Sequence, residues 1–266
     1  MAVNDSYTVV EDGSVTLNLL ANDTDVDNTA LQLKVASING TALTPGVAQT
    51  IVVPNGTVKI TAAGVMSFVP APNYNGPATF NYVVRDPGGL TSTGTVNVTV
   101  NPVNDTPQAV DDAGSAPQGT TITGNLLSND LDVDGDALTV TTFQVDTDGD
   151  GTPDTVTEGG PAVDVYDSSG IKAGTLTVST TGDYTFVPDA NFSGPVPTIT
   201  YNIQDPTGTT SSADLQLYLA FVNQVPVADD DSLSMLEDTV LDFALKASDP
   251  DLTNPDPTVT ESLDVF

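Results

Sequence analysis

The chain has 266 residues, of which 36 are acidic and five are basic, so its formal net charge is −31. This balance makes nucleic acid and anionic membrane surfaces poor partners. The absence of Cys and His excludes disulfides, thiolate or imidazole zinc sites, and Ser/His/Asp or Cys/His catalytic groups. Hydrophobic residues make up 38%, which is enough for packed cores, so the acidity does not indicate disorder. We expect a strand-rich protein stabilised by something other than disulfides, and a divalent cation fits that role.

The amino terminus carries none of the basic and apolar regions of a signal peptide, and no apolar stretch reaches the length of a membrane span. The chain begins directly on repeat sequence. We therefore expect a segment of a longer polypeptide whose targeting signals lie elsewhere.

Two and a third copies of one unit follow each other along the chain. "AVND" at residues 2–5 matches "AVDD" at 109–112, and "GTVKITAAGVMSFVP" at 56–70 matches "GTLTVSTTGDYTFVP" at 174–188. The offset rises from 107 to 118 between these matches, so the second copy carries an insertion of 11 residues. A third copy opens at Pro226 and stops at Phe266. The repeats predict domains at residues 1–105 and 106–224, followed by an incomplete repeat at 225–266.

Within a copy, apolar residues alternate with period two, and Gly, Pro, Asn and Asp separate the runs. Seven or eight short strands per copy are typical of an immunoglobulin-like sandwich. The fold class that we predict is all-β, with tandem immunoglobulin/cadherin-like β-sandwich domains in a linear array. The predicted core residues are Leu17, Leu19, Val58, Ile60, Phe68, Phe80, Tyr82, Val96, Val98 and Val100 in the first copy, and Leu126, Leu176, Val178, Phe186 and Tyr201 in the second.

Acidic loops with alternating Asp recur between two apolar runs of each copy. This spacing lets several oxygens converge on one hard cation, which takes about 6 to 8 oxygen ligands. The alternative is that Asp and Asn only form turns and solubilise the loop. The candidate ligands are Asp23, Asp25 and Asp27 in the first copy, Asp130, Asp132, Asp134 and Asp136 in the second, and Asp249 and Asp251 in the third.

Further acidic residues lie where the copies end. Glu11 recurs as Glu237, although the middle copy has Gln118 at this place, and Asp86 recurs as Asp205. Strand-end loops of one sandwich and the linker to the next are neighbours in such folds. We therefore expect these groups to form one inter-domain cation cluster, in which a shared ion turns repulsion into attraction. The alternative for the linkers is a Pro-containing solvated spacer.

The insertion contains the motif "DTDGDGTPD". Asp146, Asp148 and Asp150 followed by Gly fit the first half of an EF-hand-type loop, with Asp154 at its ninth position. The acid expected at position twelve is displaced by one residue, so we expect a calcium loop in a β context rather than helix-loop-helix. The alternative is a disordered acidic loop.

The junction "VND-P-A-DD" at residue 103, together with "NLLANDTDVD", "FVPAPNYNG" and "FNYVVRDPGGLTS", resembles the bacterial cadherin-like repeats found in tandem in large RTX-type adhesins. The resemblance covers essentially the whole chain. It implies that calcium at the junctions stiffens the string of domains. Carried over, it places Glu11, Asn104, Asp105, Asp132 and Asp134 at the first junction. In the second junction, Gln118 and Gln224 replace two of the acids, which implies fewer ions there or none.

The resulting hypothesis is a calcium-stabilised structural extender segment of a large bacterial surface adhesin, secreted or at the cell surface. Its expected partners are neighbouring repeats of the same chain, with host or surface ligands bound through other domains. The alternative is a calcium-dependent glycan- or peptide-binding module, presented by the insertion. An enzyme is disfavoured because the acids sit in repeated turn motifs and no Asp-Thr-Gly or Asp-Ser-Gly occurs.

Overall fold

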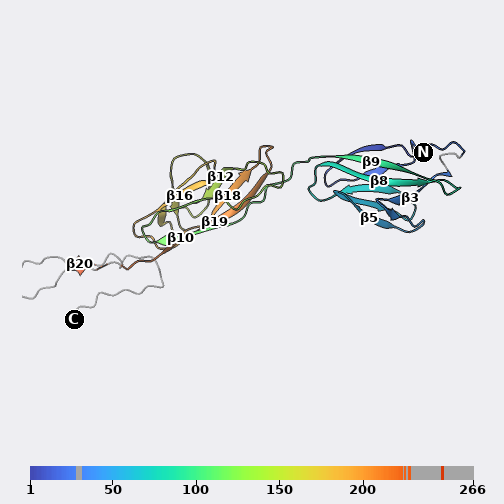
Figure 1. Ribbon diagram of the computed structural model, residues 1–266. Coiled ribbons are helices and arrows are strands. Elements are labelled where there is room, and N and C mark those ends of the chain that lie inside the picture. The colour runs from blue at the N-terminus through green and yellow to red at the C-terminus, as the bar shows by residue number, and fades with distance from the viewer. Residues whose placement is uncertain (28–31, 224, 226, 229–246, 249–266) are drawn as a thin grey trace, which may run out of the picture. The chain divides into compact units, whose positions relative to one another are not determined.

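The computed structural model describes residues 1–27, 32–223, 225, 227–228 and 247–248 (Figure 1). The described residues are all-β and divide into two compact units, which we call unit 1 (Met1–Asn104) and unit 2 (from Asp105 onward). Among the described residues we find no helical segment with the length and hydrophobicity of a membrane span. Most of the expected third repeat lies outside the described residues.

Unit 1 folds into two sheets. The first sheet has the order β1-β9-β8-β3-β4 and the second has the order β2-β7-β6-β5. The strands are β1 (Asp5–Val10), β2 (Val15–Leu17), β3 (Lys34–Ile38), β4 (Thr41–Ala42), β5 (Gln49–Val53), β6 (Gly56–Ile60), β7 (Met66–Pro70), β8 (Gly76–Arg85) and β9 (Thr91–Asn101).

Unit 2 repeats this arrangement. Its sheets have the orders β10-β19-β18-β12-β13 and β11-β16-β15-β14, and a short strand, β17, also pairs with β19. The strands are β10 (Asp112–Pro117), β11 (Ile122–Asn125), β12 (Thr139–Val145), β13 (Asp154–Thr157), β14 (Val163–Tyr166), β15 (Lys172–Val178), β16 (Asp183–Pro188), β17 (Gly194–Pro195), β18 (Ile199–Gln204) and β19 (Thr210–Ala220). Farther along, β20 (Val227–Ala228) pairs with β21 (Ala247–Ser248).

The predicted all-β fold with tandem sandwich domains is confirmed, but the predicted number of strands is wrong. The described residues of unit 1 form nine strands, and residues 105–223 of unit 2 form ten. Two-residue strands such as β4 leave no alternation in the sequence, and β8 of unit 1 corresponds to two separate strands, β17 and β18, in unit 2.

A hydrophobic core lies between the two sheets of each unit. Alternate residues of β8 and β9 are buried, as the period-two pattern requires when one face of a sheet packs on another sheet. The rings of Phe68 in β7 and Phe80 in β8 stack with their centroids 5.9 Å apart and so join the two sheets of unit 1. All 15 predicted core residues are buried.

The first and last strands of each unit run in parallel. β1 pairs with β9 from Asp5↔Val96 to Val10↔Asn101, and β10 pairs with β19 in the same way. Because the two strands point in the same direction, the chain enters at one end of a unit and leaves at the opposite end.

Candidate metal centre

The loop between β11 and β12 of unit 2 brings three carboxylates together. Asp132, Asp134 and Asp136 each offer an oxygen within 4.8 Å of the others. Asp132 is buried, and its Oδ1 accepts hydrogen bonds from the backbone N of Asp134 (2.9 Å) and of Asp136 (3.5 Å). An Asp that accepts the amide two residues later forms a local turn. The alternating Asp spacing therefore folds the loop and makes its own carboxylates converge.

Asp132 Oδ2 is the atom that points to a ligand. Asp132 is only 6% exposed, and this oxygen has no hydrogen-bond partner among the described residues. A hollow of about 270 Å³ lies beside it, lined by Asp130, Asp132 and Asp136 among others. Desolvation and the charges of Asp132, Asp134 and Asp205 raise the pKa of Asp136. An unpaired buried charge is unfavourable. A calcium ion, which prefers carboxylate oxygens, would bind the unpartnered Asp132 Oδ2 and would also offset the repulsion among the neighbouring carboxylates. These residues fit the metal.

Two further predicted ligands lie at the same end of unit 2. Asp205 is buried in the turn between β18 and β19, where its Oδ1 accepts the backbone N–H groups of Thr207 (2.8 Å) and Gly208 (2.8 Å). The backbone N of Asp105 donates to Asp134 Oδ2 over 2.8 Å. The fold thus collects acids that are about a hundred residues apart in the sequence.

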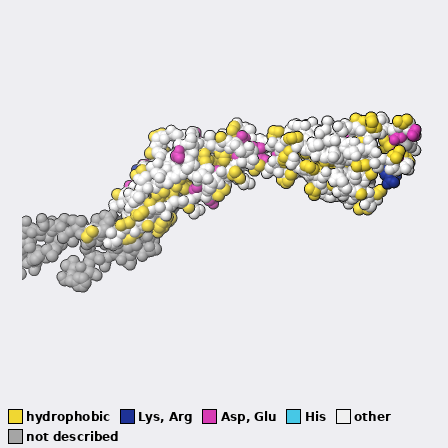
Figure 2. All heavy atoms as spheres, in the orientation of Figure 1, with side chains coloured by type: hydrophobic (Ala, Val, Ile, Leu, Met, Phe, Trp, Pro, Cys, Tyr) yellow, Lys and Arg dark blue, Asp and Glu magenta, His cyan; other side chains and the backbone are white. Residues whose placement is uncertain are grey.

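The corresponding loop of unit 1 makes a similar turn, and its described residues do not form a group of three converging carboxylates. Asp25 Oδ1 accepts the backbone N of Asp27 over 3.0 Å, as Asp132 does from Asp134. Asp25 and Asp86 line one hollow of about 100 Å³, so the structure brings these two predicted ligands together. Asp27 is exposed, and residues 28–31 lie outside the described part of the chain. Figure 2 shows acidic side chains gathered at the end of unit 1 where the N-terminus lies.

A buried tyrosine and two carboxylates lie beneath this loop in unit 1. The hydroxyl of Tyr82 is 2.9 Å from both Asp23 Oδ1 and the carbonyl O of Val3. Asp23 also accepts the backbone N of Val3 over 2.7 Å. Asp5 and Asp23 are 7% and 3% exposed, and the Oδ2 of each has no partner in the described region. Burial raises the pKa of Asp5, and the nearby charge of Asp23 adds to this effect.

Burial, followed by the hydrogen bond to Asp23, also raises the pKa of Tyr82 far above its ordinary range, so its hydroxyl remains a donor. We call Tyr82, Asp5 and Asp23 the tyrosine–carboxylate cluster of unit 1. It lies beside Tyr82, a predicted core residue, at a place where the period-two pattern does not indicate buried carboxylates.

Unit 2 repeats the cluster with Tyr201, Asp112 and Asp130. The Tyr201 hydroxyl is 3.0 Å from Asp112 Oδ2 and 3.3 Å from Asp130 Oδ1, and Asp130 accepts the backbone N of Val110 over 2.8 Å. Sequence reasoning identified Asp23 and Asp130 only as cation ligands and missed Asp5 and Asp112. The signal was present, because all four acids recur at the offset of 107.

Glu11 lies at the end of β1, beside the last residues of unit 1. Its Oε1 accepts the backbone N of Val103 over 2.6 Å, and its Oε2 is buried with no partner among the described residues. Gln118 takes the same place in unit 2, where its Oε1 accepts the backbone N of Val222 over 3.2 Å. The amide thus reproduces the hydrogen bond of Glu11 without its charge, and the expectation of fewer ions at the second junction stays a prediction.

The insertion forms the hairpin loop between β12 and β13, at residues 146–153, so its β context is confirmed. It brings together Asp146, Asp148 and Asp154. Both oxygens of Asp146 accept backbone N–H groups, including that of Gly151 over 2.7 Å. Asp150 instead bonds to Thr152, and these hydrogen bonds lower its pKa. Unlike Asp132, Asp146 therefore has hydrogen-bond donors for both of its oxygens before any cation binds.

Three predicted ligands, Glu237, Asp249 and Asp251, lie outside the described residues. Asn104 is the last residue of unit 1. The expectation that acids of neighbouring copies share one cation stays a prediction.

Comparison with known proteins agrees with this architecture. Residues 1–99 match the family model of the bacterial Ig domain, and residues 104–220 match that of the bacterial cadherin-like domain. The chain therefore carries two Ig/cadherin-like domains in tandem, and such domains are typically structural or adhesive rather than enzymatic. A search of curated proteins found no match.

Several solved structures are similar to the chain. Human mucin-like protocadherin EC1-2 is 14% identical, with a TM-score of 0.41, over 82% of this chain and 97% of that one. Human CDH23 EC21-23 is 17% identical, with a TM-score of 0.49, and the match covers 93% of this chain and 84% of that one. Drosophila N-cadherin EC1-4 is 12% identical, with a TM-score of 0.41, and the match covers 94% of this chain and 58% of that one.

Proposed function

We propose that these two domains form a calcium-stabilised structural extender in a large bacterial surface adhesin, holding a ligand-binding region away from the cell. The observation that carries the extender role is the parallel pairing of the first and last strands in each unit. A chain that enters one end and leaves the other gains the whole length of each sandwich. Strands of 11 residues such as β9 and β19 span about 36 Å at about 3.3 Å per residue.

The calcium part of the proposal depends on the cluster of Asp132, Asp134 and Asp136. Its support is the buried Asp132 Oδ2, which has no partner in the described residues, inside a group of like charges. Asp105 and Asp205 would complete the oxygen set from the same end of unit 2. Extracellular calcium modules bind at about 10⁻⁴ to 10⁻³ M, so occupancy requires the calcium concentration outside a cell.

The hairpin loop is a second candidate calcium site, of lower expected affinity. Asp146 already accepts backbone N–H groups at both oxygens, so a cation would gain less from binding there. A calcium-dependent ligand site on this loop, the alternative function, requires that second ion.

The test is a calorimetric titration of the chelator-stripped chain with calcium, repeated for Asp132→Asn, Asp146→Asn and Asp12→Asn. Asn keeps the size of Asp132 and one acceptor oxygen, so the variant removes charge without removing the turn. Asp12 is an exposed acid of unit 1 outside every cluster, and its variant is the matched control. We expect Asp132→Asn to remove the tightest binding event and Asp12→Asn to change nothing.

If wild-type protein releases no heat with calcium and melts identically in calcium and in chelator, the calcium part of the proposal is wrong. If Asp146→Asn and not Asp132→Asn removes the tightest event, the hairpin loop is the principal site and the assignment to Asp132 is wrong.

A further inference from the structure

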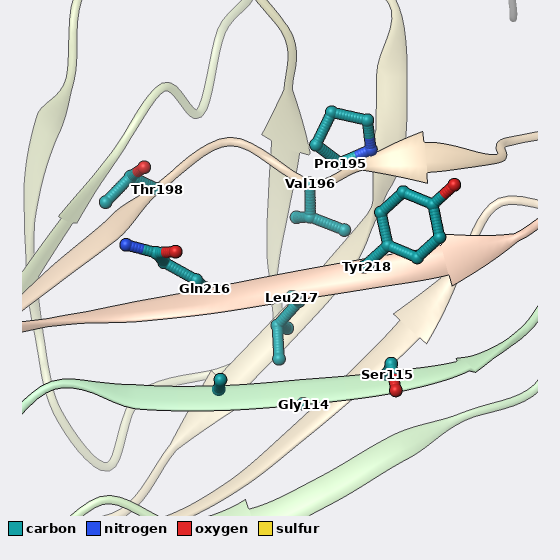
Figure 3. A pocket seen from close by; sticks show the side chains of 9 residues that line it. Gly114, Ser115, Pro195, Val196, Thr198, Gln216, Leu217 and Tyr218 are labelled. Atoms are coloured by element: carbon teal, nitrogen blue, oxygen red, sulfur yellow. The ribbon is translucent and has the colours of Figure 1, made fainter.

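Unit 2 has a groove on the outer surface of one sheet, separate from the acidic loops. It has a volume of about 500 Å³ and lies over β10, β19 and the segment between β17 and β18. Figure 3 shows Pro195 and Tyr218 at one end of it and Thr198 and Gln216 at the other. The exposed side chains that line it are Ala113, Ser115, Pro195, Thr198, Gln216 and Tyr218.

The strand register explains the shape of the groove. In the parallel pair, Ala113 lies opposite Gln216 and Ser115 opposite Tyr218, and Pro195 faces Tyr218 from the other side. Small side chains on β10 therefore adjoin long ones on β19. This step in side-chain length leaves a concave surface with one wall formed by the tyrosine ring, which is 47% exposed.

Unit 1 does not have these features at the corresponding place. Thr99 takes the position of Tyr218, between Thr8 and Pro77. β8 runs unbroken along β9, whereas in unit 2 residues 196–198 interrupt the corresponding strand. The ring and the interruption are thus specific to unit 2 and are not required by the sandwich fold.

The chemistry of the groove differs from that of the rest of the chain. None of the nine lining residues is charged, although the chain has 36 acidic residues. The polar groups are two hydroxyls, an amide and a phenol, carried by Ser115, Thr198, Gln216 and Tyr218. Uncharged donors and acceptors beside an exposed aromatic face suit a ligand with neutral hydroxyl groups and an apolar ring face.

We propose that this groove binds a neutral saccharide, with one sugar ring against Tyr218 and its hydroxyl groups bonded to Gln216 and Thr198. None of the groove residues belongs to the acidic clusters, so binding is independent of calcium. The site would add direct contact with a polysaccharide to the extender role and does not depend on that role.

The experiment is an NMR titration of the ¹⁵N-labelled full chain with maltoheptaose, cellohexaose and mannohexaose, and with oligogalacturonate as an anionic probe. We expect at least one neutral probe to shift the backbone amide signals of Ser115, Gln216 and Tyr218, with and without chelator. Tyr218→Thr, which installs the residue of unit 1, should weaken binding about tenfold. Tyr218→Phe should retain most of it.

The matched control is Thr99→Ala on the corresponding face of unit 1, which should leave affinity unchanged. An unshifted melting temperature in Tyr218→Thr would show that lost binding is not lost folding. The proposal is overturned if no neutral probe shifts these amides at millimolar concentration, or if Tyr218→Thr binds as tightly as wild type. It is also overturned if a proline-rich peptide, and no sugar, shifts these amides.

Discussion

Unit 1 and unit 2 have the same strand order and the same buried tyrosine, yet they use their acidic residues differently. In unit 1 the two most buried Asp residues, Asp5 and Asp23, lie beside Tyr82 in the core. In unit 2 the corresponding Asp112 and Asp130 are only half-buried, and the most buried carboxylates, Asp132 and Asp205, lie at the loops. Both units therefore have acidic residues at corresponding positions. The most buried Asp side chains lie beside the core tyrosine in unit 1 and at the candidate cation site in unit 2.

The largest expected effect comes from the tyrosine hydroxyls. Tyr82→Phe deprives the buried Asp23 of a donor and should lower the free energy of unfolding of unit 1 by about 3 kcal/mol. Tyr201→Phe should lower that of unit 2 by only about 1–2 kcal/mol, because Asp112 and Asp130 are less buried as whole residues than Asp5 and Asp23. Urea denaturation followed by NMR signals of each unit separates the two transitions. Equal losses would mean that burial of the carboxylates does not decide the effect.

Asp132→Asn should change the stability of unit 2 in opposite directions in the absence and in the presence of calcium. Without calcium it removes a charge from a repelling cluster and should raise the melting temperature of unit 2 slightly. At a calcium concentration about 100 times the dissociation constant, wild-type unit 2 gains about 2.7 kcal/mol, and the variant should lose most of that gain. Scanning calorimetry in calcium and in chelator measures both, with Asp12→Asn as the control. A loss of equal size in both conditions would indicate a purely structural role.

A smaller effect is expected from exchanging the small residue opposite each tyrosine. Gly94 pairs with Tyr82 and Ala213 pairs with Tyr201. A Cβ at Gly94 would lie 2.4 Å from the Tyr82 ring, so Gly94→Ala should destabilise unit 1 by about 1–2 kcal/mol. Ala213→Gly should destabilise unit 2 by about 0.5–1 kcal/mol. The same denaturation experiment applies, and a more stable Gly94→Ala variant would show that the ring moves freely.

The smallest expected effect depends on pH. Burial raises the pKa of Asp5, so folded unit 1 holds this proton more tightly than the unfolded chain does. The stabilisation from Asp5 is complete below its ordinary value of 3.8 and is lost as the pH rises through the raised pKa. Asp5→Asn should therefore raise the melting temperature by a few degrees at pH 7 and by less at pH 3. A constant difference across this range would contradict the raised pKa.

Much of the candidate site could be predicted from the sequence, because it is built from local turns. The spacing of Asp132, Asp134 and Asp136 makes the loop fold on itself through hydrogen bonds between neighbours. Likewise, the motif at Asp146 predicts a loop in a β context that gathers Asp146, Asp148, Asp150 and Asp154, although Asp150 bonds to Thr152 rather than joining the cluster. The role of Asp5 and Asp112 could not be predicted in this way, because each lies far along the chain from its tyrosine. Asp5 is 77 positions from Tyr82, and Asp112 is 89 positions from Tyr201.

The sequence by itself determined the two sandwich domains, their core and the acidic loops, since period-two alternation and turn residues act over a few positions. Only the tertiary structure decided which acids are buried, which carboxylate oxygens lack a hydrogen-bond partner among the described residues and where Tyr218 meets Pro195. These outcomes depend on strand register between segments far apart in the chain. Register is set by the packing of whole sheets, so a pattern within one strand does not reveal it.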